Sequence, residues 1–219
     1  MNKINYQKEL EKIIASQDLP AKVFLHSCCA PCSSFCMEYL RRYFDVTVFY
    51  YNPNIMQEEE YRKRVAEQKR LIDAYNQLEE QVVTNGTETE RFILRKISFT
   101  EGNYDVARYL ETIKGLEDAP EGGSRCGRCF ELRLRETARV AKEMGMDYFT
   151  TTLTISPLKN AQLLNEIGNR IGEEFGIAFL PSDFKKNNGY LRSIELSKEY
   201  DLYRQNYCGC DFSKPKENI

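Results

Sequence analysis

Three thiols lie within five residues of one another near the start of the chain. Cys28, Cys29 and Cys32 follow an apolar run and precede a segment with helical spacing. A disulfide between the neighbours Cys28 and Cys29 would close a very small and strained ring, which argues against a structural pair. Clustered thiolates are typical of a metal centre with several coordination positions. The sequence therefore predicts metal ligation here, with further ligands supplied by another part of the chain.

A second pair, Cys126 and Cys129, stands at the junction of a Gly-rich loop and a segment with strong helical spacing. Residues three apart share one face of a helix, and a helix N-terminus favours thiolates through its dipole and free N–H groups. With Cys28 and Cys29 they make four thiolates, enough for a [4Fe-4S] cluster. Adjacent cysteines reach two separated irons more easily than one ion. This favours the cluster over its alternative, a structural zinc site with four cysteines.

Two cysteines and one histidine near the first cluster are left without a role by this assignment. Cys32 could be a spare ligand, hold a second metal ion beside the cluster, or be an ordinary thiol at a helix start. Cys36 lies one helical turn later and is expected to be a core thiol, because free cysteine buries well. His26, the only histidine, could donate a hydrogen bond to the centre or protonate a substrate. A lone histidine is more commonly a satisfied structural residue.

The third cysteine pair is Cys208 and Cys210, which flank a single glycine. A disulfide between them would close so short a loop that it removes little entropy from the unfolded chain. It would also be strained and therefore easily reduced. These properties suit a two-electron carrier better than a structural crosslink. The alternative is that both sulfurs bind metal.

Composition limits the class of protein. The chain has 219 residues, of which 42% are hydrophobic and 29% charged, as expected of a globular protein. No apolar run is long enough to span a membrane, and the first residues lack the apolar core of a signal peptide. We therefore expect a cytoplasmic protein with no membrane partner, in which the clustering of seven of the eight cysteines indicates metal or redox chemistry rather than a disulfide framework.

Charge limits how the chain can meet a nucleic acid. The formal net charge of −2 excludes a protein that binds RNA over its whole surface, so RNA binding would need a local basic patch. Neither nucleotide-binding glycine motif, GxxxxGK[ST] or GxGxxG, occurs. Each short basic run is either a phosphate contact or a solvated helix or loop face. The runs are Arg41-Arg42, Arg62-Lys63-Arg64, Lys69-Arg70 and Lys185-Lys186.

Segments with strand and helix patterns alternate along the chain. The expected strands are residues 22–26, 46–51, 81–83, 148–153 and 177–180. The expected helices are residues 6–16, 33–43, 57–76, 126–144, 159–175 and 190–200, and residues 87–114 are mostly helical in pattern. This alternation predicts an α/β fold, a layered and mostly parallel sheet with helices on both faces.

One site should gather the chemistry. Ligands of open parallel sheets bind beyond the carboxyl ends of the strands, where the loops at 26–32, 52–54 and 154–160 should meet. We expect one α/β domain over residues 1–219. Residues 87–125 would be a helical or loop insertion, and residues 201–219 a C-terminal segment that carries the last cysteine pair.

These motifs together resemble the QueH family of epoxyqueuosine reductases. The matching segments run in order from about residue 22 to residue 212. The double-cysteine loop and the terminal YRQNYCGC are specific only in combination. The segments are HSCCAPC at 26–32, YNPNI at 51–55, RCGRC at 125–129, TTL at 151–153, SPLKN at 156–160 and YRQNYCGC at 203–210.

The resemblance implies reduction of epoxyqueuosine to queuosine at the wobble position of the tRNA anticodon, with an unidentified electron donor. It implies an adenine-nucleotide-hydrolase-like (HUP-type) fold with helical additions. It also implies a [4Fe-4S] cluster, for which an adjacent mononuclear metal ion is an open addition. The implied cluster ligands are Cys28, Cys29, Cys126 and Cys129, and the implied redox-active pair is Cys208 and Cys210.

Three other functions agree with parts of the sequence. A zinc protein could use the same cysteines structurally, without an electron path. A tRNA-modifying enzyme of the ATP-pyrophosphatase type, such as a thiolation enzyme, would share the expected fold. However, its Ser-Gly-Gly nucleotide loop is missing, and the cysteine loop follows the first strand instead. An iron–sulfur reductase for a small-molecule epoxide would use the same chemistry without RNA.

Overall fold

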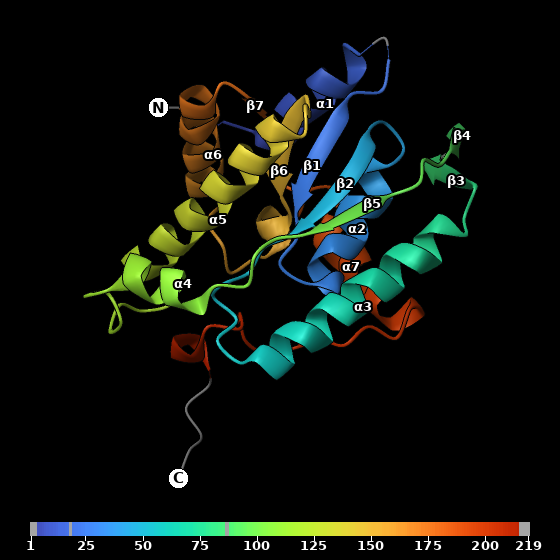
Figure 1. The fold of residues 1–219 in the computed structure, drawn as a ribbon. Coiled ribbons are helices and arrows are strands. Elements are labelled where there is room, and N and C mark those ends of the chain that lie inside the picture. Colours follow the sequence, from blue (N-terminus) through green and yellow to red (C-terminus); the bar gives the residue numbers. More distant parts are fainter. Residues whose placement is uncertain (1–3, 18, 86–87, 215–219) are drawn as a thin grey trace.

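The computed structural model describes residues 4–17, 19–85 and 88–214, and its centre is a five-stranded sheet (Figure 1). The strands lie in the order β5-β2-β1-β6-β7, and every neighbouring pair is parallel. The predicted α/β class with a largely parallel sheet is confirmed. The strands are β1 (Lys22–His26), β2 (Asp45–Tyr50), β5 (Ser98–Glu101), β6 (Tyr148–Thr151) and β7 (Ala178–Phe179).

Helices cover both faces of this sheet, as predicted. Helices α1, α2 and α3 form the core of one face, with α7 packed on α2, and α5 and α6 cover the other face (Figure 1). The helices are α1 (Tyr6–Ala15), α2 (Ala30–Leu40), α3 (Glu58–Asn76), α4 (Val106–Ile113), α5 (Ser124–Glu143), α6 (Ala161–Phe175) and α7 (Gly189–Glu199). Within the described part of the chain, no helix is both long and apolar enough to cross a membrane.

The inner strands are apolar on both sides. In β1, Val23 and Leu25 belong to the core shared with α1, α2 and α3, whereas Phe24 belongs to the core shared with α5 and α6. Successive side chains of a strand point to opposite faces, so a parallel strand covered on both sides needs apolar residues at each position. This is why continuous apolar runs marked the inner strands in the sequence.

The mostly helical pattern of residues 87–114 was a wrong prediction. In the described part of this range, only α4 is helical. The residues before it form an antiparallel hairpin of β3 (Glu80–Asn85) and β4 (Glu88–Ile93), and then β5, which extends the sheet beside β2. The predicted strand at 81–83 exists, but it lies outside the parallel sheet. Strand formation depends on the partner available in the fold, and here pairing outweighed local helical spacing.

Helix α5 carries the second cysteine pair and begins two residues earlier than predicted. Its predicted apolar stripe is buried except at Met144, which is 44% exposed. The helix has ended by then, and Gly145 takes the left-handed conformation (φ +64°) typical of a helix stop. Met144 therefore turns away from the core. Of the predicted C-terminal segment, residues 215–219 lie outside the described residues.

Candidate metal and redox site

The first three cysteines come together where β1 ends and α2 begins. The sulfurs of Cys28, Cys29 and Cys32 all lie within 4.8 Å of one another. Cys29 is the N-cap of α2 in an extended conformation, and a proline at the first helical turn starts the helix without losing a needed N–H group. The turn from strand to helix is therefore short, and it presents these three sulfurs, the thiol triad, on one side.

The triad includes Cys32, which the sequence left without a role. The Sγ atoms of Cys28 and Cys29 are 3.9 Å apart. Sulfurs that share one tetrahedral ion lie about 3.8 Å apart, given a metal–sulfur distance of ~2.3 Å. The spacing therefore suits a single ion as it stands, whereas ligands of separate irons in a cluster would have to spread. Neither arrangement changes the donor type, which suits zinc, iron and iron–sulfur centres alike.

The other two cysteine pairs line an adjoining pocket. Cys126 and Cys129, in the first two turns of α5, line it together with Cys208 and Cys210. Cys208 also lines a larger cavity of about 330 Å³ that contains the thiol triad, here called the thiol cavity. All eight cysteines are free thiols. Cys208 thus stands between the triad and the pair on α5, and the fold gathers seven of the eight cysteines in one region.

The C-terminal segment is held in place by the loop after β2 and by α3. Asn54 donates from Nδ2 toward the carbonyl oxygen (3.4 Å) and the sulfur (3.7 Å) of Cys208. The backbone N–H of Met56 donates to the carbonyl oxygen of Gly209 (3.2 Å). At Gly209, φ is +103°, and a Cβ atom would lie 2.7 Å from Cγ1 of Ile55. Only glycine fits there, so the spacing of the Cys208/Cys210 pair is fixed by packing.

Three loops meet at this site, as predicted from the strand ends. The cysteine loop after β1 and the loop after β6, through Ser156 to Lys159, both line the thiol cavity. The loop after β2 holds two of the site's segments in place, because Asn52 donates to the carbonyl oxygen of Ser27 (2.8 Å) and Asn54 contacts Cys208. The three strands are neighbours in the sheet. Their carboxyl ends therefore open on one place.

The triad is electrostatically uneven. Hydrogen bonds with Cys29 and Cys32 hold the pKa of the Cys28 thiol well below its ordinary value. The hydrogen bond with Cys28 raises the pKa of Cys29 to about 12, and the pKa of Cys32 is raised for the same reason. One thiolate is thus favoured among three sulfurs. A bound cation would favour the other two thiolates as well, because metal ligation requires deprotonation.

Four cationic side chains line the thiol cavity: the exposed Arg204, and Arg64, Arg133 and Lys159. Arg64 and Arg133 are each 1% exposed, and Lys159 is half-buried. Burial alone would lower the pKa of Arg133, but the charges of nearby thiolates, Cys129 first among them, raise it overall. The same balance, with Cys208 leading, raises the pKa of Lys159. Positive charge is therefore concentrated where thiolates would form.

His26 is part of the frame behind the site. It is fully buried, and its Nδ1 lies 2.9 Å from Oγ1 of Thr151. Burial, reinforced by the charge of Arg133, lowers the pKa of His26 to about 3, so the ring is neutral. These contacts favour the structural interpretation of this histidine.

Two residues at the site were not singled out from the sequence. Arg133 lies one helical turn after Cys129, and this four-residue spacing was the available signal. Tyr109 on α4 is buried and donates from its hydroxyl group to Sγ of Cys210 (3.0 Å). Nothing local marked Tyr109, because it reaches the site only through the packing of α4 on α5.

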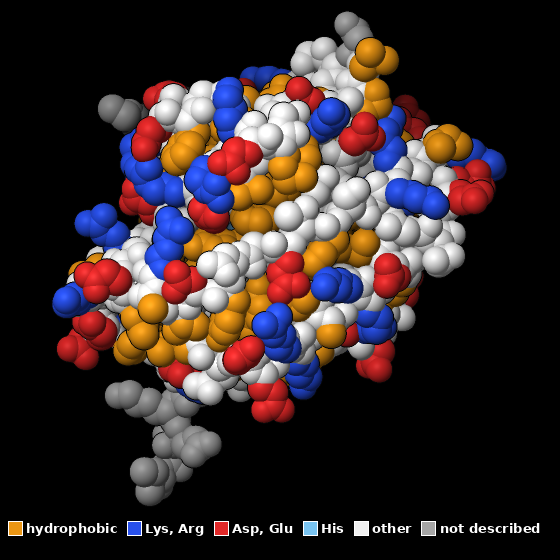
Figure 2. All heavy atoms as spheres, viewed as in Figure 1, with side chains coloured by type: hydrophobic (Ala, Val, Ile, Leu, Met, Phe, Trp, Pro, Cys, Tyr) orange, Lys and Arg blue, Asp and Glu red, His pale blue; other side chains and the backbone are white. Residues whose placement is uncertain are grey.

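The basic runs do not act as one surface. Arg41 is buried against the carbonyl oxygens of Tyr75 (2.6 Å) and Leu78 (3.1 Å), so its prediction as a phosphate contact is wrong. Lys185 pairs with Asp183 at 2.7 Å. On the face shown in Figure 2, basic and acidic side chains alternate over apolar patches, without a broad basic area. This agrees with the nearly balanced charge of the chain.

The residues fit a thiolate-bound metal centre. Thiols from three segments line two adjoining cavities, and buried cations face them. An anionic centre needs both features, because a buried negative charge is costly without opposite charge nearby. The same donor set also fits a structural zinc ion.

The comparisons with known proteins point to one family. Residues 23–216 match the family model described as "Epoxyqueuosine reductase QueH". A protein of that name from Staphylococcus epidermidis is 41% identical, over 99% of this chain and 87% of its own length. Proteins of the same name from Streptococcus pyogenes (40%, over 99% of this chain and 81% of theirs) and Thermotoga maritima (35%, over 87% and 89%) are also similar. The chain therefore belongs to the QueH family of epoxyqueuosine reductases.

Proposed function

We propose that this protein reduces epoxyqueuosine to queuosine at the wobble position of the tRNA anticodon. The observation that carries the proposal is that Cys208 lines the cavity of the thiol triad and also, with Cys210, the adjoining pocket, in a chain of this family. Removing the epoxide oxygen as water and leaving a carbon–carbon double bond consumes two electrons and two protons. The site must therefore supply both.

Cys208 and Cys210 are suited to hold these electrons and protons. When two thiols close to a disulfide, they release two electrons and two protons, which balances the reduction of one epoxide to an alkene and water. The disulfide across Gly209 would be strained and thus readily reopened by a dithiol or another two-electron donor. The physiological donor is still to be identified. Tyr109 holds the Cys210 sulfur in place on the other side.

A metal centre would be held by cysteines from two segments. We propose Cys28, Cys29, Cys126 and Cys129 as the ligands of a [4Fe-4S] cluster, which leaves Cys32 for a mononuclear ion beside it. When bound, such a centre supplies single electrons, and an open metal position polarises a substrate oxygen. The protein's own contribution is the cavity wall, which fixes the sulfurs and balances their charge with Arg64, Arg133 and Lys159.

The substrate would enter as an unstacked base. Sequence-specific RNA recognition mostly targets single-stranded loops whose bases are splayed out and stacked on aromatic or arginine side chains. Tyr190 and Arg204 line the thiol cavity and are both exposed, and the half-buried Lys159 lines it as well. We propose these three side chains as contacts for the anticodon loop.

Metal analysis combined with a tRNA assay tests the proposal. Protein purified without oxygen is analysed for iron, acid-labile sulfide and zinc, and then assayed on tRNA that carries epoxyqueuosine. We expect about four irons and four sulfides per chain, a visible absorption band that bleaches with dithionite, and formation of queuosine. Zinc alone would favour the structural alternative. Sulfur transfer that requires ATP would favour a tRNA-modifying enzyme of the ATP-pyrophosphatase type. Equal activity on the free nucleoside would favour a reductase that acts on a small-molecule epoxide.

A further inference from the structure

Arg133 is a buried cation for which the described residues provide no carboxylate partner. Its side chain is 1% exposed. Nη2 donates to Oδ1 of Asn52 (2.6 Å), and Nε donates to Nε2 of His26 (3.2 Å). Both acceptors are neutral. Among residues 4–17, 19–85 and 88–214, no carboxylate oxygen lies within 4.0 Å of it, and Glu121, the only acidic residue of that set that lines the thiol cavity, is exposed.

The remaining nitrogen of Arg133 faces sulfur. Nη1 lies 3.9 Å from Sγ of Cys129. Taking a guanidinium ion out of water is costly unless an opposite charge compensates it. In this environment only thiolates can provide that charge. An anionic sulfur centre is thus what makes the burial of this arginine favourable.

Contacts with His26 and Asn52 fix the position of Arg133. Nε2 of His26 lies 3.2 Å from Nε of Arg133 and 3.1 Å from the carbonyl oxygen of Tyr51, and its Nδ1 lies 2.9 Å from Oγ1 of Thr151, so the ring that contacts Arg133 is held on both sides. Asn52 is in turn anchored to the carbonyl oxygen of Ser27. These supports lie at the carboxyl ends of β6, β2 and β1, three neighbouring strands. The guanidinium group is therefore held by the sheet itself and has little freedom to leave the sulfurs.

We propose that Arg133 is a positioning residue whose fixed positive charge stabilises the more negative, reduced state of the thiolate-bound centre and thereby raises its reduction potential. This inference rests on the proposed iron–sulfur function. Reduction of such a centre would add one electron, supplied in the titration by a chemical reductant such as dithionite, and would neither break a bond nor require a proton. The added negative charge is stabilised by a nearby cation, and more strongly so in a buried site.

The chain offers a matched control. Arg41 is equally buried and also lacks a carboxylate partner within 4.0 Å in the described part of the chain, but it donates to two backbone carbonyl groups near the end of α3. The free-energy cost of burying the Arg41 guanidinium group is offset by the partial negative charge at the C-terminus of α3 rather than by sulfur. Arg133→Met and Arg41→Met therefore remove the same group from two buried places, of which only one lies beside the cysteines.

The test is an anaerobic redox titration of the iron-loaded protein, followed by absorbance and electron paramagnetic resonance. At the wild-type midpoint, Arg133→Met should lower the ratio of reduced to oxidised centre about tenfold, or ~59 mV for a one-electron couple. Arg133→Lys should restore most of that ratio, and Arg41→Met should leave it unchanged. Asn52→Asp, which gives Arg133 a carboxylate partner without removing it, should lower the ratio in the same direction.

The outcomes separate this inference from the proposed function. Wild-type protein that contains zinc and no reducible iron would contradict the proposed function. A normal wild-type centre, with Arg133→Met and Arg41→Met titrating alike, would overturn the role of Arg133 and leave the function intact. If Arg133→Met does not fold or does not hold iron, the midpoint potentials of Arg133→Lys and Asn52→Asp test the inference in its place. A wild-type midpoint in Asn52→Asp would then overturn the inference.

Discussion

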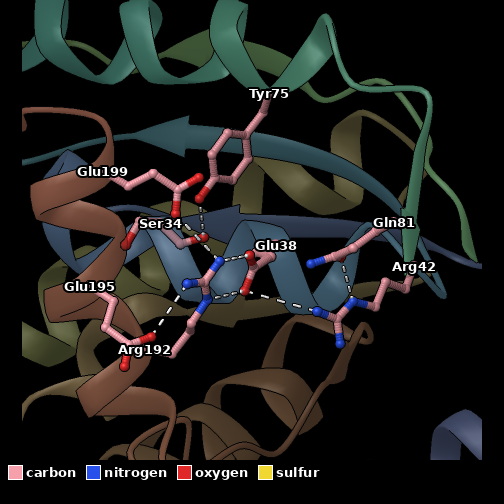
Figure 3. A network of polar contacts seen from close by, with 8 residues as sticks. All are labelled: Ser34, Glu38, Arg42, Tyr75, Gln81, Arg192, Glu195 and Glu199. Atoms are coloured by element: carbon pink, nitrogen blue, oxygen red, sulfur yellow. Dashed lines mark hydrogen bonds and ion pairs between the residues drawn. The ribbon is translucent and has the colours of Figure 1, made fainter. Parts of the chain in front are cut away.

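Two groups of arginines in this molecule are stabilised in different ways. Between α2 and α7, Arg192 meets three carboxylates: Glu38 at 2.7 Å, Glu195 at 3.3 Å and Glu199 at 3.6 Å (Figure 3). Glu38 also lies 3.9 Å from Arg42. In the thiol cavity, Arg133 contacts two neutral acceptors and a sulfur, and no carboxylate, among the residues that the structure describes.

The difference shows that the fold uses some charged side chains for stability and leaves others without an opposite charge nearby. In the Arg192 group each cation is neutralised by acids, so the contacts hold α7 on α2 and exert little field elsewhere. Beside the cysteines the positive charge is left uncompensated by acids, which is costly in an interior. Such a cost is tolerated at functional sites, where the missing partner is supplied by the centre itself.

Arg64 stands between the two groups. Its Nε pairs with Glu60 at 2.7 Å, but Nη1 donates to the carbonyl oxygen of Cys208 (3.3 Å). Its Nη2 is buried and has no hydrogen-bond partner in the described part of the chain. The residue also lines the thiol cavity. Arg64 therefore combines a structural ion pair with an unsatisfied donor close to the cysteines.

The largest effect is expected on the sulfur side of the comparison. Cys208→Ser should abolish turnover on epoxyqueuosine tRNA while the iron content stays at the wild-type level, because this sulfur is a proposed electron carrier and not a proposed ligand. Cys36→Ser is the control, since Cys36 is buried in the core away from both cavities. Turnover by Cys208→Ser at the wild-type rate would disprove the electron-relay role.

On the carboxylate side the expected effect is on folding. Glu38→Gln should lower the free energy of unfolding by about 1–3 kcal/mol, because Glu38 is 12% exposed and accepts charged hydrogen bonds from Arg192. Urea denaturation of the variant and of wild type measures this difference. The midpoint potential of the metal centre should not change. A shifted potential would show that the two arginine groups are not independent.

A smaller effect is expected from a neutral donor. Tyr109→Phe removes the hydrogen bond to the Cys210 sulfur, worth about 1 kcal/mol. The dithiol should become easier to oxidise by roughly fivefold, since the hydrogen bond stabilises the reduced sulfur. Equilibration of the Cys208/Cys210 pair with a glutathione buffer gives the ratio of disulfide to dithiol. Tyr104→Phe, whose hydroxyl group donates to a backbone carbonyl group instead, should leave it unchanged.

The smallest effect concerns acid. A hydrogen bond from Arg70 lowers the pKa of Glu67, whose carboxylate also accepts from the backbone N–H of Tyr203 (2.7 Å). Because its folded pKa is below the unfolded one, its stabilisation is present above the unfolded value, about 4.3, and is lost as pH falls through the folded value. Glu67→Gln should cost under about 1 kcal/mol at pH 7. Thermal unfolding of variant and wild type should converge in acid; a constant difference down to pH 2 would contradict the prediction.

The sequence was most informative where one local rule sufficed. Apolar runs such as residues 23–25 marked inner strands, because burial on both faces leaves no polar position. Strand order along the chain and the rule of carboxyl ends placed the cysteine loop and the loop after β6 at one cavity. Helical spacing found α3 and α5, whose faces repeat over several turns. Short segments such as β5 gave no such signal.

By itself, the sequence determined the α/β class, the family, and the cysteine clusters proposed to carry the chemistry, because periodicity and motif spacing are local properties of the chain. Only the tertiary structure decided that Cys32 joins the triad, that Cys208 links the two cavities, and that Arg133 faces sulfur without an acid beside it. These depend on contacts between residues far apart in the chain. The charge balance and the distances between side chains inside a protein are set only when packing excludes water and determines which side chains are neighbours.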